Sequence, residues 1–454
     1  MRDEWTHPQL LARERLVEVN TPASPMPAML PLANHGQKEH MIADILTAPT
    51  LGAFFYDDQR AIRAGAQQVG FDYTGEPVTP GFSRIRVPGQ ALGVGLVLDD
   101  SFVAWGDMMT VQYSAAGGRE PVFNRDRAQA LLDGPLKPRL LALDFSNLRE
   151  DIARVFAPLP DGSSVPSSVQ YGLSQALLGA YAHRRRLTIA EVLADAYDLL
   201  LIAEPVPIYA QSGDERKVNV QKMVMKRVDV LPHGLINTPA KFGQDGRLFA
   251  DYAKWVAAQV NGAADPAYQP TLHFDLYGNA GIEFHDDPLK IAEYIARVAE
   301  SVAPYQLHIE SPADYGSTDN QIEGFLQIRH HLNALGCNAK IVADEWCDTL
   351  ADVERFCKSG AADIVQIKMP DVGSVTHSFE AVLLCKAHGV GAYLGGSCVE
   401  TDLSARISVH AALASRADMQ LAKPGMGVDE ALTIVGNEQA RLLALLRAKN
   451  ARRG

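Results

Sequence analysis

Three acidic residues and one lysine stand at the ends of consecutive apolar runs in the second half of the chain. They are Asp275 in TLHFDLYG, Glu310 in QLHIESP, Asp344 in KIVADEW and Lys368 in DIVQIKMP. The gaps of 35, 34 and 24 residues each match one strand, one crossover helix and two loops, so the four side chains are expected to meet around a parallel sheet. Carboxylates that converge at buried strand ends repel one another unless a divalent cation neutralises them. The spacing therefore predicts a metal site that faces a base.

The base is expected to be Lys368. Gln366 and Lys368 are two residues apart on one strand, so both side chains leave the same face of the sheet. A partly desolvated lysine beside a divalent cation has a lowered pKa, which suits a general base at neutral pH. Two simpler interpretations stay open: the three carboxylates are separate helix caps or salt bridges, and the lysine is a solvent-facing rim residue.

A histidine and a glycine-rich turn complete the candidate site. His233 follows a proline at the end of the second apolar run of this region, and strands two and six of a barrel lie on opposite sides. His233 and Lys368 would then flank a ligand from two faces, which favours proton transfer at a stereocentre. The alternative for His233 is a structural role. The turn GGSC, with Ser397 and Cys398, is expected to orient a substrate carboxylate.

The elements that must position these residues form a repeated pattern. From residue 206 to 454 the sequence contains eight apolar strand candidates, separated for the most part by helix-length amphipathic stretches. Eight strand and helix units over this length predict a TIM-type (β/α) barrel, which places its active site at the carboxyl ends of the strands. The eight candidates are VPIYAQS, DVLPHGL, TLHFDLYG, QLHIESP, KIVADEW, DIVQIKMP, GAYLGGS and MQLAKPG.

Residues 41–205 read as a separate α+β domain with strands first and helices second. ALGVGLVLDDSFVAWGD predicts a hairpin around Asp99 and Asp100, and SVQYGLSQALLGAYAHRRR predicts a helix. The stretches YDDQRAIRAGA and QYSAAGGRE are expected to be long loops of the kind that cover a site on another domain.

Residues 1–40 are rich in proline and lack a clear period, which predicts a disordered or loosely attached extension. A chain that begins at Met41 is therefore expected to keep the melting temperature and the turnover rate of the full chain. Thermal unfolding and a rate assay of both chains check this. Loss of a dimer or of most activity in the shorter chain would make the extension a docking segment.

Composition narrows the class of protein. The chain has 454 residues, a net charge of −12 and a pI near 5.6, so no electrostatic footprint for nucleic acid or anionic membrane is present. The sequence has neither a membrane span nor a signal peptide and predicts a cytoplasmic protein. The five cysteines lack CxxC spacing, which indicates reduced thiols, and only Cys398 is placed to meet a ligand.

The strings AQSGDER, KRVDVLPHGLIN, HFDLYG, VADEWC, VQIKMPD, GGSCVET and LAKPGMGVDE carry a resemblance to a known family. The ladder of strand-end acids and lysine resembles the enolase superfamily, and the longer strings resemble methylaspartate ammonia-lyases. The resemblance runs from about Phe54 to about residue 447. It implies a barrel with an N-terminal capping domain, Mg²⁺ with K⁺ as an activator, and a homodimer. It also implies reversible elimination of ammonia from L-threo-3-methylaspartate to mesaconate, through C3 proton abstraction and a metal-stabilised enolate.

The resemblance also implies a role for each matching position. Asp275, Glu310 and Asp344 match the metal ligands, Lys368 the base on one face and His233 the residue on the other. The positions that match substrate contacts are Gln211, Gln366, Ser397, Cys398, His233 and, less closely, Gln112. The sequence departs from the family near the ligand: Ser397 and Met369 stand where the family usually has threonine, Val399 where it has asparagine, and Ser311 and Ser374 where it has glycine.

Three other functions stay open at this point. An enolase-superfamily lyase, racemase or epimerase that acts on a different 3-substituted aspartate shares the enolate step. A Schiff-base aldolase also uses a lysine at a barrel mouth but does not need three converging carboxylates. A non-catalytic barrel has little reason to carry a full set of ligands and bases.

Overall fold

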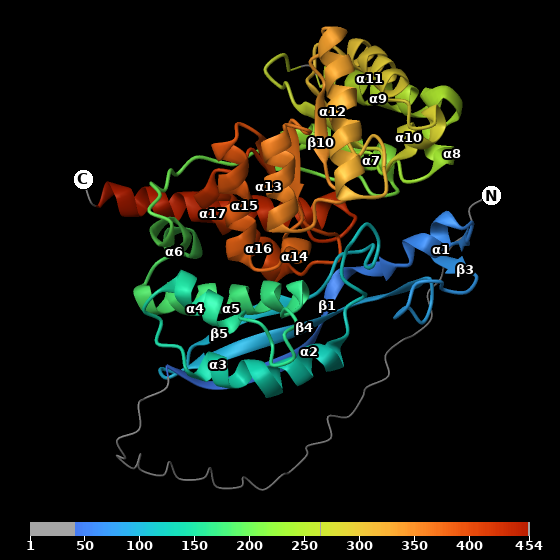
Figure 1. The fold of residues 1–454 in the computed structure, drawn as a ribbon. Helices are drawn as coiled ribbons and strands as arrows, with labels where there is room; N and C mark the ends of the chain where they lie inside the picture. The colour runs from blue at the N-terminus through green and yellow to red at the C-terminus, as the bar shows by residue number, and fades with distance from the viewer. Residues whose placement is uncertain (1–40, 264, 453–454) are drawn as a thin grey trace, which may run out of the picture. The chain divides into compact units, whose positions relative to one another are not determined.

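The computed structural model describes residues 41–263 and 265–452. The extension predicted for residues 1–40 lies outside the described residues. The described chain begins with an antiparallel sheet and helices and continues into a closed barrel (Figure 1).

The N-terminal sheet has the strand order β1-β4-β5, with β1 at Ile42–Asp57, β4 at Arg86–Leu98 and β5 at Val103–Met108. Strands β4 and β5 are antiparallel and join at Asp99 and Asp100, so the predicted hairpin is confirmed. A second, two-stranded sheet pairs β2, Gln67–Val69, with β3, Asp72–Thr74.

The prediction of a loop for YDDQRAIRAGA is wrong. Tyr56 and Asp57 end β1, and α1, Gln59–Arg63, follows. Asp58 starts this helix because its carboxylate accepts the amide of Ala61 at 3.2 Å, which is the bond that an N-cap residue makes. A single capping side chain thus turns a polar stretch into a helical turn.

Helices α2, α3 and α5 pack on this sheet. Helix α5 lies between β5 and three barrel helices (Figure 1), which are α14 (Met369–Val372), α15 (Val375–Ala387) and α16 (Asp402–Ser415). The approach of α5 to β5 is close: a Cβ on Gly106 would lie 2.0 Å from the carbonyl oxygen of Gly172. The helices, with α5 as predicted, are α2 (Arg125–Leu131), α3 (Lys137–Leu141), α4 (Leu148–Val155), α5 (Ser167–Arg185) and α6 (Ile189–Ala196).

The barrel contains all eight predicted strands. They close in the order β10-β11-β12-β13-β6-β7-β8-β9, and every pairing is parallel, so the predicted TIM-type barrel is confirmed. The strands are β6 (Ile208–Tyr209), β7 (Val230–His233), β8 (Thr271–Asp275), β9 (Leu307–Glu310), β10 (Lys340–Ala343), β11 (Ile364–Ile367), β12 (Gly391–Leu394) and β13 (Met419–Leu421).

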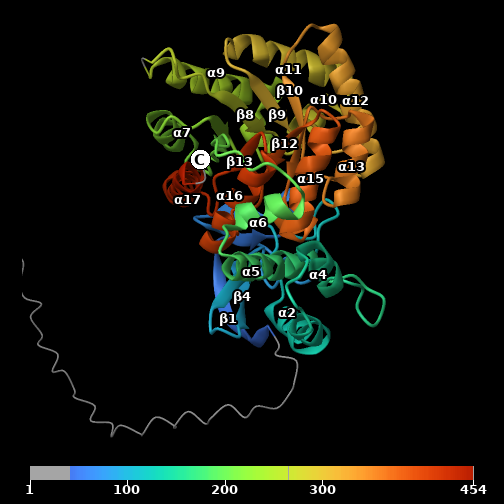
Figure 2. The same ribbon diagram turned by 90° about the vertical axis from the view of Figure 1, so that its left-hand side faces the viewer.

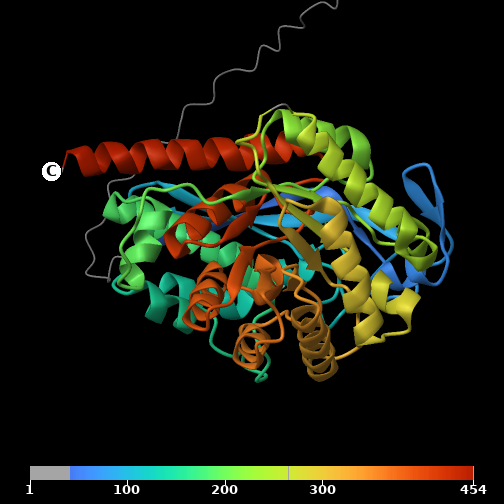
Figure 3. The same cartoon turned by 90° about the horizontal axis from the view of Figure 1, so that it is seen from above.

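Helices cover the outside of the barrel (Figure 2). The longest, α17, runs straight along one side and packs on α16 and α7 (Figure 3). The barrel helices are α7 (Arg216–Met225), α8 (Pro239–Phe242), α9 (Arg247–Asn261), α10 (Asn279–Phe284), α11 (Pro288–Val302), α12 (Thr318–Ala334), α13 (Leu350–Ser359), α14 (Met369–Val372), α15 (Val375–Ala387), α16 (Asp402–Ser415) and α17 (Val428–Ala451). None of the helices in the described ranges is long and apolar enough to cross a membrane.

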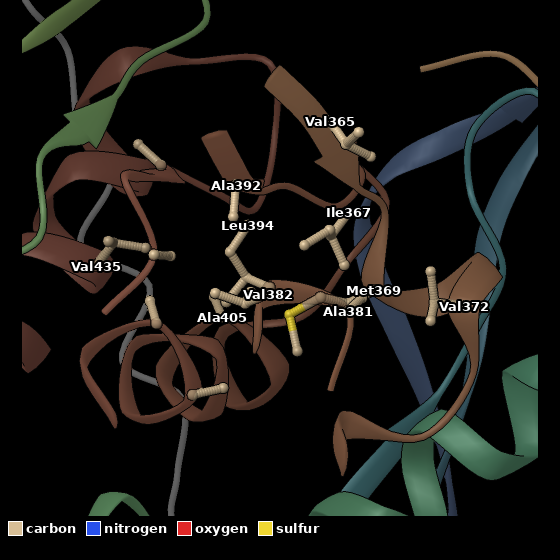
Figure 4. Close-up of a cluster of buried hydrophobic side chains, with 14 of the residues drawn as sticks. Val365, Ile367, Met369, Val372, Ala381, Val382, Ala392, Leu394, Ala405 and Val435 are labelled. Atoms are coloured by element: carbon tan, nitrogen blue, oxygen red, sulfur yellow. The ribbon is translucent and has the colours of Figure 1, made fainter. Parts of the chain in front are cut away.

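Successive side chains along a barrel strand alternate between the apolar core and the barrel interior. On β11, Val365 and Ile367 belong to the apolar cluster drawn in Figure 4, together with Val382 of α15 and Ala405 of α16. Gln366, between the two, leaves the opposite face of the strand. The apolar cluster therefore fixes the strand while its polar residue faces the barrel interior.

The N-terminal domain touches the barrel at the loop after β12. The amide of Ala53 donates to the carbonyl oxygen of Glu400 at 3.1 Å. A Cβ on Gly52 would lie 1.7 Å from the carbonyl oxygen of Val399, so only glycine fits this approach. The predicted domain boundary at residues 205 and 206 stays a prediction.

Candidate active site

The three predicted metal ligands meet at the carboxyl ends of neighbouring strands. Asp275 ends β8, Glu310 ends β9 and Asp344 directly follows β10. Each offers a carboxylate oxygen, and these oxygens lie within 4.8 Å of one another. The exposed fractions are 2%, 0% and 5%, so the group is buried as a unit. The interpretation of three separate caps or salt bridges is therefore wrong.

The pKa values of this acidic cluster show that too little positive charge lies near Asp275 and Glu310. Burial raises the pKa of Asp275 and of Glu310 well above the usual values, and the neighbouring carboxylates raise both further. Burial also raises the pKa of Asp344, but Lys368 and Arg119 outweigh it, and the net pKa lies below its usual value. A divalent cation would supply the missing positive charge.

Glu310 is held by two side chains, one from β8 and one from β11. Nε2 of His273 lies 2.7 Å from Oε2 of Glu310, and Nε2 of Gln366 donates to Oε1 at 2.9 Å. Burial lowers the pKa of His273 well below its usual value, so the ring is neutral, and the tautomer with its proton on Nε2 donates to an ionised Glu310. Both oxygens of Glu310 are thereby oriented, which is the usual arrangement around a metal-binding carboxylate.

Lys368 follows β11 directly and points at the acidic cluster. Its Nζ lies 2.9 Å from Oδ2 of Asp344, and its side chain is 15% exposed, so the rim interpretation is wrong. The lowered pKa expected for Lys368 beside a divalent cation stays a prediction, and the protein's own groups act in the other direction. Burial and Arg119 lower the pKa, but the carboxylates of Asp344, Asp371 and Glu345 outweigh them, and the net pKa is raised.

His233 ends β7, which is four strands from β11 around the barrel, so it faces Lys368 from the opposite side. Its Nδ1 accepts the amide of Leu235 at 3.3 Å, and its Nε2 lies 3.4 Å from Oδ2 of Asp275. Burial, with help from Lys368, lowers the pKa of His233 to about 4. The ring is therefore neutral near pH 7, with its proton on Nε2.

The loop after β12 is fixed by hydrogen bonds to the buried carboxylate of Glu400. Glu400 accepts from Nζ of Lys423 at 3.0 Å and from the hydroxyl of Tyr171 at 2.7 Å, and both members of the ion pair are fully buried. The amide of Ser397 donates to the same carboxylate at 3.0 Å. A Cβ on Gly396 would lie 2.1 Å from Oε1 of Glu400, which explains the glycine before Ser397.

Ser397 and Cys398 present polar atoms to the pocket. Oγ of Ser397 accepts the amides of Gln112 at 3.0 Å and Val399 at 3.3 Å, and a hydroxyl can still donate its own hydrogen. Burial raises the pKa of the Cys398 thiol well above its usual value, so the thiol stays protonated and donates to Oε1 of Gln112 at 3.3 Å. Nε2 of Gln211 donates to the carbonyl oxygen of Gly425 at 2.9 Å.

These side chains line one small cavity of about 50 Å³ at the mouth of the barrel. Of the site residues predicted from the sequence, all except Glu310 line it, and Glu310 joins through the acidic cluster. The predicted residues in the lining are Gln112, Gln211, His233, Asp275, Asp344, Gln366, Lys368, Ser397 and Cys398. A cavity this small fits a small molecule rather than a polymer.

Sequence reasoning missed several lining residues, of which Arg119 is the most informative. It lies in the predicted covering loop QYSAAGGRE. Its guanidinium is buried and lies 2.9 Å from Asp371, 3.3 Å from Asp344 and 3.4 Å from Asp348. The loop therefore brings a cation from the N-terminal domain to Asp344, one of the three predicted metal ligands. Others that were missed are Tyr113, Tyr277, Glu345, Tyr393 and Leu421; Glu345 is adjacent in sequence to Asp344, a signal that could have found it.

Two departures from the family have local explanations. Ser311 has a φ of +46°, a left-handed conformation that favours glycine, and its hydroxyl donates to the carboxylate of Glu345. Ser374 caps α15 by accepting the amide of His377 at 3.1 Å. Met369 and Val399 are fully buried. The sulfur of Met369 accepts from Nζ of Lys423 at 3.6 Å, and nothing in the structure explains why Val399 replaces a polar residue.

The comparisons with known proteins agree with this geometry. The family model described as the methylaspartate ammonia-lyase N-terminus matches residues 40–198, and the one described as its C-terminus matches residues 200–448. The chain belongs to the methylaspartate ammonia-lyase family. It is an ammonia-lyase.

Relatives in this family match over most of their length. Methylaspartate ammonia-lyase 1 of Carboxydothermus hydrogenoformans is 49% identical over 407 residues, which is 89% of this chain and 97% of the relative. The solved structure of the Citrobacter amalonaticus enzyme containing (2S,3S)-3-methylaspartic acid has a TM-score of 0.88 at 43% identity and covers 89% of this chain and 99% of its own.

Two further structures complete the comparison. A magnesium complex of β-methylaspartase from Clostridium tetanomorphum has a TM-score of 0.85 at 41% identity, over 90% of this chain and 99% of its own. A muconate lactonizing enzyme from Pseudomonas fluorescens has a TM-score of 0.59 at 16% identity, over 88% of this chain and 89% of its own, and shares the fold alone.

Proposed function

We propose that this enzyme catalyses the reversible elimination of ammonia from L-threo-3-methylaspartate to give mesaconate, with Mg²⁺ held by Asp275, Glu310 and Asp344. The observation that carries the proposal is a cluster of three converging carboxylates, two of which line one small pocket together with Lys368 and His233. The relative that contains (2S,3S)-3-methylaspartic acid supports the choice of substrate.

The residues fit a magnesium ion. Mg²⁺ prefers oxygen ligands, and a small set of carboxylates together with substrate and water is its usual environment. The raised pKa values of Asp275 and Glu310 express a need for positive charge at this point. When bound, the ion would stabilise the negative charge that develops on a substrate carboxylate. Activation by K⁺ and a homodimer stay predictions from the family.

The protein's own side chains would carry out proton transfer and substrate binding. Lys368, in its neutral form, takes the C3 proton at Nζ, while His233 closes the other face of the substrate. The Ser397 hydroxyl and the Cys398 thiol are donors and suit a carboxylate oxygen of the substrate. Gln211 and Gln366 are fixed by bonds to Gly425 and Glu310 and complete the wall.

A panel of amino acids tests the proposal. The chelator-treated enzyme, with and without added Mg²⁺, is mixed with aspartate, both diastereomers of 3-methylaspartate and 3-substituted analogues. The expected result is absorbance of an unsaturated acid and release of ammonia, strongest with L-threo-3-methylaspartate and only with Mg²⁺. Isomerisation without ammonia release would favour a racemase or epimerase, and borohydride trapping that is insensitive to chelator would favour a Schiff-base aldolase.

Arg119 gives a separate prediction about stability. Arg119→Met leaves Asp348 and Asp371 without their cation and Asp344 with Lys368 alone. Breaking a buried ion pair from one side lowers the free energy of unfolding by about 3 to 5 kcal/mol. Added Mg²⁺ should recover part of this loss because it neutralises Asp344. Denaturant unfolding with and without Mg²⁺ measures both effects.

The matched control is Arg84→Met. Arg84 pairs with Asp72 on the surface, with side chains 68% and 46% exposed, and exposed pairs contribute about 0 to 1 kcal/mol. Equal losses of stability in the two variants, or a loss in Arg119→Met that Mg²⁺ leaves unchanged, would contradict the role given to Arg119.

A further inference from the structure

The Gln112 side chain reaches the pocket from the N-terminal domain and is held by one carboxylate. Nε2 of Gln112 donates to Oδ2 of Asp57 at 2.8 Å, and the Asp57 amide donates to the Gln112 carbonyl oxygen at 2.9 Å. Asp57 is 1% exposed. A buried carboxylate accepts hydrogen bonds only, so the amide nitrogen of Gln112 must face Asp57.

Asp57 is itself locked by Arg86. Nε and Nη2 of Arg86 donate to the two carboxylate oxygens of Asp57 at 2.7 and 2.8 Å, a bidentate pair. Nη1 of Arg86 donates to the carbonyl oxygen of Phe71 at 2.6 Å, and the guanidinium lies 4.5 Å from the Phe71 ring centre and 4.9 Å from that of Tyr73. The pair is therefore rigid as well as buried.

The relay Arg86–Asp57–Gln112 decides which atom of Gln112 faces a ligand. With Nε2 bound to Asp57, Oε1 points away from it, and this oxygen accepts from the Cys398 thiol. Gln112 and Cys398 both line the pocket. An acceptor oxygen cannot bind a substrate carboxylate, which has no hydrogen to donate, but it can bind an N–H group.

We propose that Arg86 and Asp57 are positioning residues that present Gln112 Oε1 to the amino group of the substrate, or to ammonia in the reverse direction. The inference rests on the proposed function, because it needs a substrate with an amino group. It places the departing ammonia beside Gln112 and Cys398, on the side of the pocket formed by the N-terminal domain.

Asp57→Asn tests the relay. The oxygen of the new amide keeps the bond from Nε of Arg86, and the NH₂ takes the place of Oδ2, where it loses the bond from Nη2 and faces Gln112. The Gln112 amide is then forced to turn, with a donor toward the pocket. In the direction from mesaconate to methylaspartate, kcat/KM for ammonia is expected to fall by about 10- to 100-fold, the range for a hydrogen bond to a charged group. KM for mesaconate and Mg²⁺ binding measured by calorimetry should be unchanged.

Two further variants give the test a control and a rescue. Asp72→Asn makes the same change in the exposed pair with Arg84 and should leave every constant unchanged. Asp57→Asn combined with Gln112→Glu reverses this hydrogen bond. The side-chain NH₂ of residue 57 donates to one carboxylate oxygen of residue 112, and the other oxygen again presents an acceptor to the pocket. The double variant is expected to regain at least about 10-fold of the lost kcat/KM for ammonia.

The possible outcomes separate this inference from the proposed function. Equal losses toward ammonia and mesaconate in Asp57→Asn, no loss at all, or no rescue in the double variant would overturn the inference. If Asp57→Asn does not fold, Gln112→Met decides: a loss confined to ammonia supports the acceptor role, and an equal loss for both substrates overturns it. If the wild-type enzyme does not aminate mesaconate, the proposed function itself fails.

Discussion

Lys368→Ala is expected to lower turnover of L-threo-3-methylaspartate by about 10²- to 10⁴-fold, the usual contribution of a positioned base. Nζ of Lys368 lies 2.9 Å from Oδ2 of Asp344. By family resemblance, the threo substrate presents its C3 proton to Lys368. His233→Ala should keep much of the threo activity. Steady-state rates of both variants, with melting temperatures as a control for folding, measure this.

The order is expected to invert with the erythro diastereomer, whose C3 proton points to the His233 side. His233→Ala should then remove most activity, and Lys368 should become dispensable. The wild-type erythro rate should be the lower one, because Nε2 of His233 carries the proton while Nδ1 accepts from Leu235, and acting as a base requires the other tautomer. A His233→Ala enzyme that loses both diastereomers equally, while Lys368→Ala keeps both, would refute the two-base assignment.

Glu310→Ala is expected to abolish turnover and to weaken Mg²⁺ binding strongly while the barrel stays folded. Both carboxylate oxygens of Glu310 are oriented by hydrogen bonds, one with His273 and one with Gln366. Without Glu310, the two remaining carboxylates would hold a hard cation poorly. Asp275→Ala and Asp344→Ala should have the same effect. Asp344→Ala should in addition free Lys368 and Arg119. Calorimetric titration of the chelator-treated variants with Mg²⁺ measures the change.

A carboxylate at the other end of the barrel serves as the matched control. Asp418 accepts the amide of Ala392 at 2.8 Å, far from the strand ends that carry the ligands, and Asp418→Asn keeps an acceptor there. This variant should bind Mg²⁺ like the wild type. Full activity of the chelator-treated wild type, or unchanged Mg²⁺ binding in Glu310→Ala, would contradict the metal site.

The sequence predicted the barrel side of the site well because strand period and topology determine it. Asp275, Glu310, Asp344 and Lys368 are strand-end residues, and a parallel barrel brings successive strand ends together regardless of side-chain detail. His233 follows from the same rule, since strands two and six face each other. These predictions needed only spacing and alternation.

The contribution of the N-terminal domain could not be predicted in the same way. Arg119 and the relay through Asp57 depend on how a loop and a strand dock onto the barrel, and no local period encodes that contact. The helix at Gln59–Arg63 was missed because one N-cap, Asp58, decides it. The effect of the protein's own groups on the pKa of Lys368 could not be predicted, because it depends on carboxylates from two separate segments of the chain.

The central claim is that proton abstraction occurs at C3 and precedes loss of ammonia. Proton NMR of the wild-type enzyme with L-threo-3-methylaspartate and Mg²⁺ in heavy water tests it most directly. We expect mesaconate and ammonium in equal amounts, with deuterium entering the remaining substrate at C3 and not at C2. Deuterium at C2, or exchange without any ammonium, would contradict it.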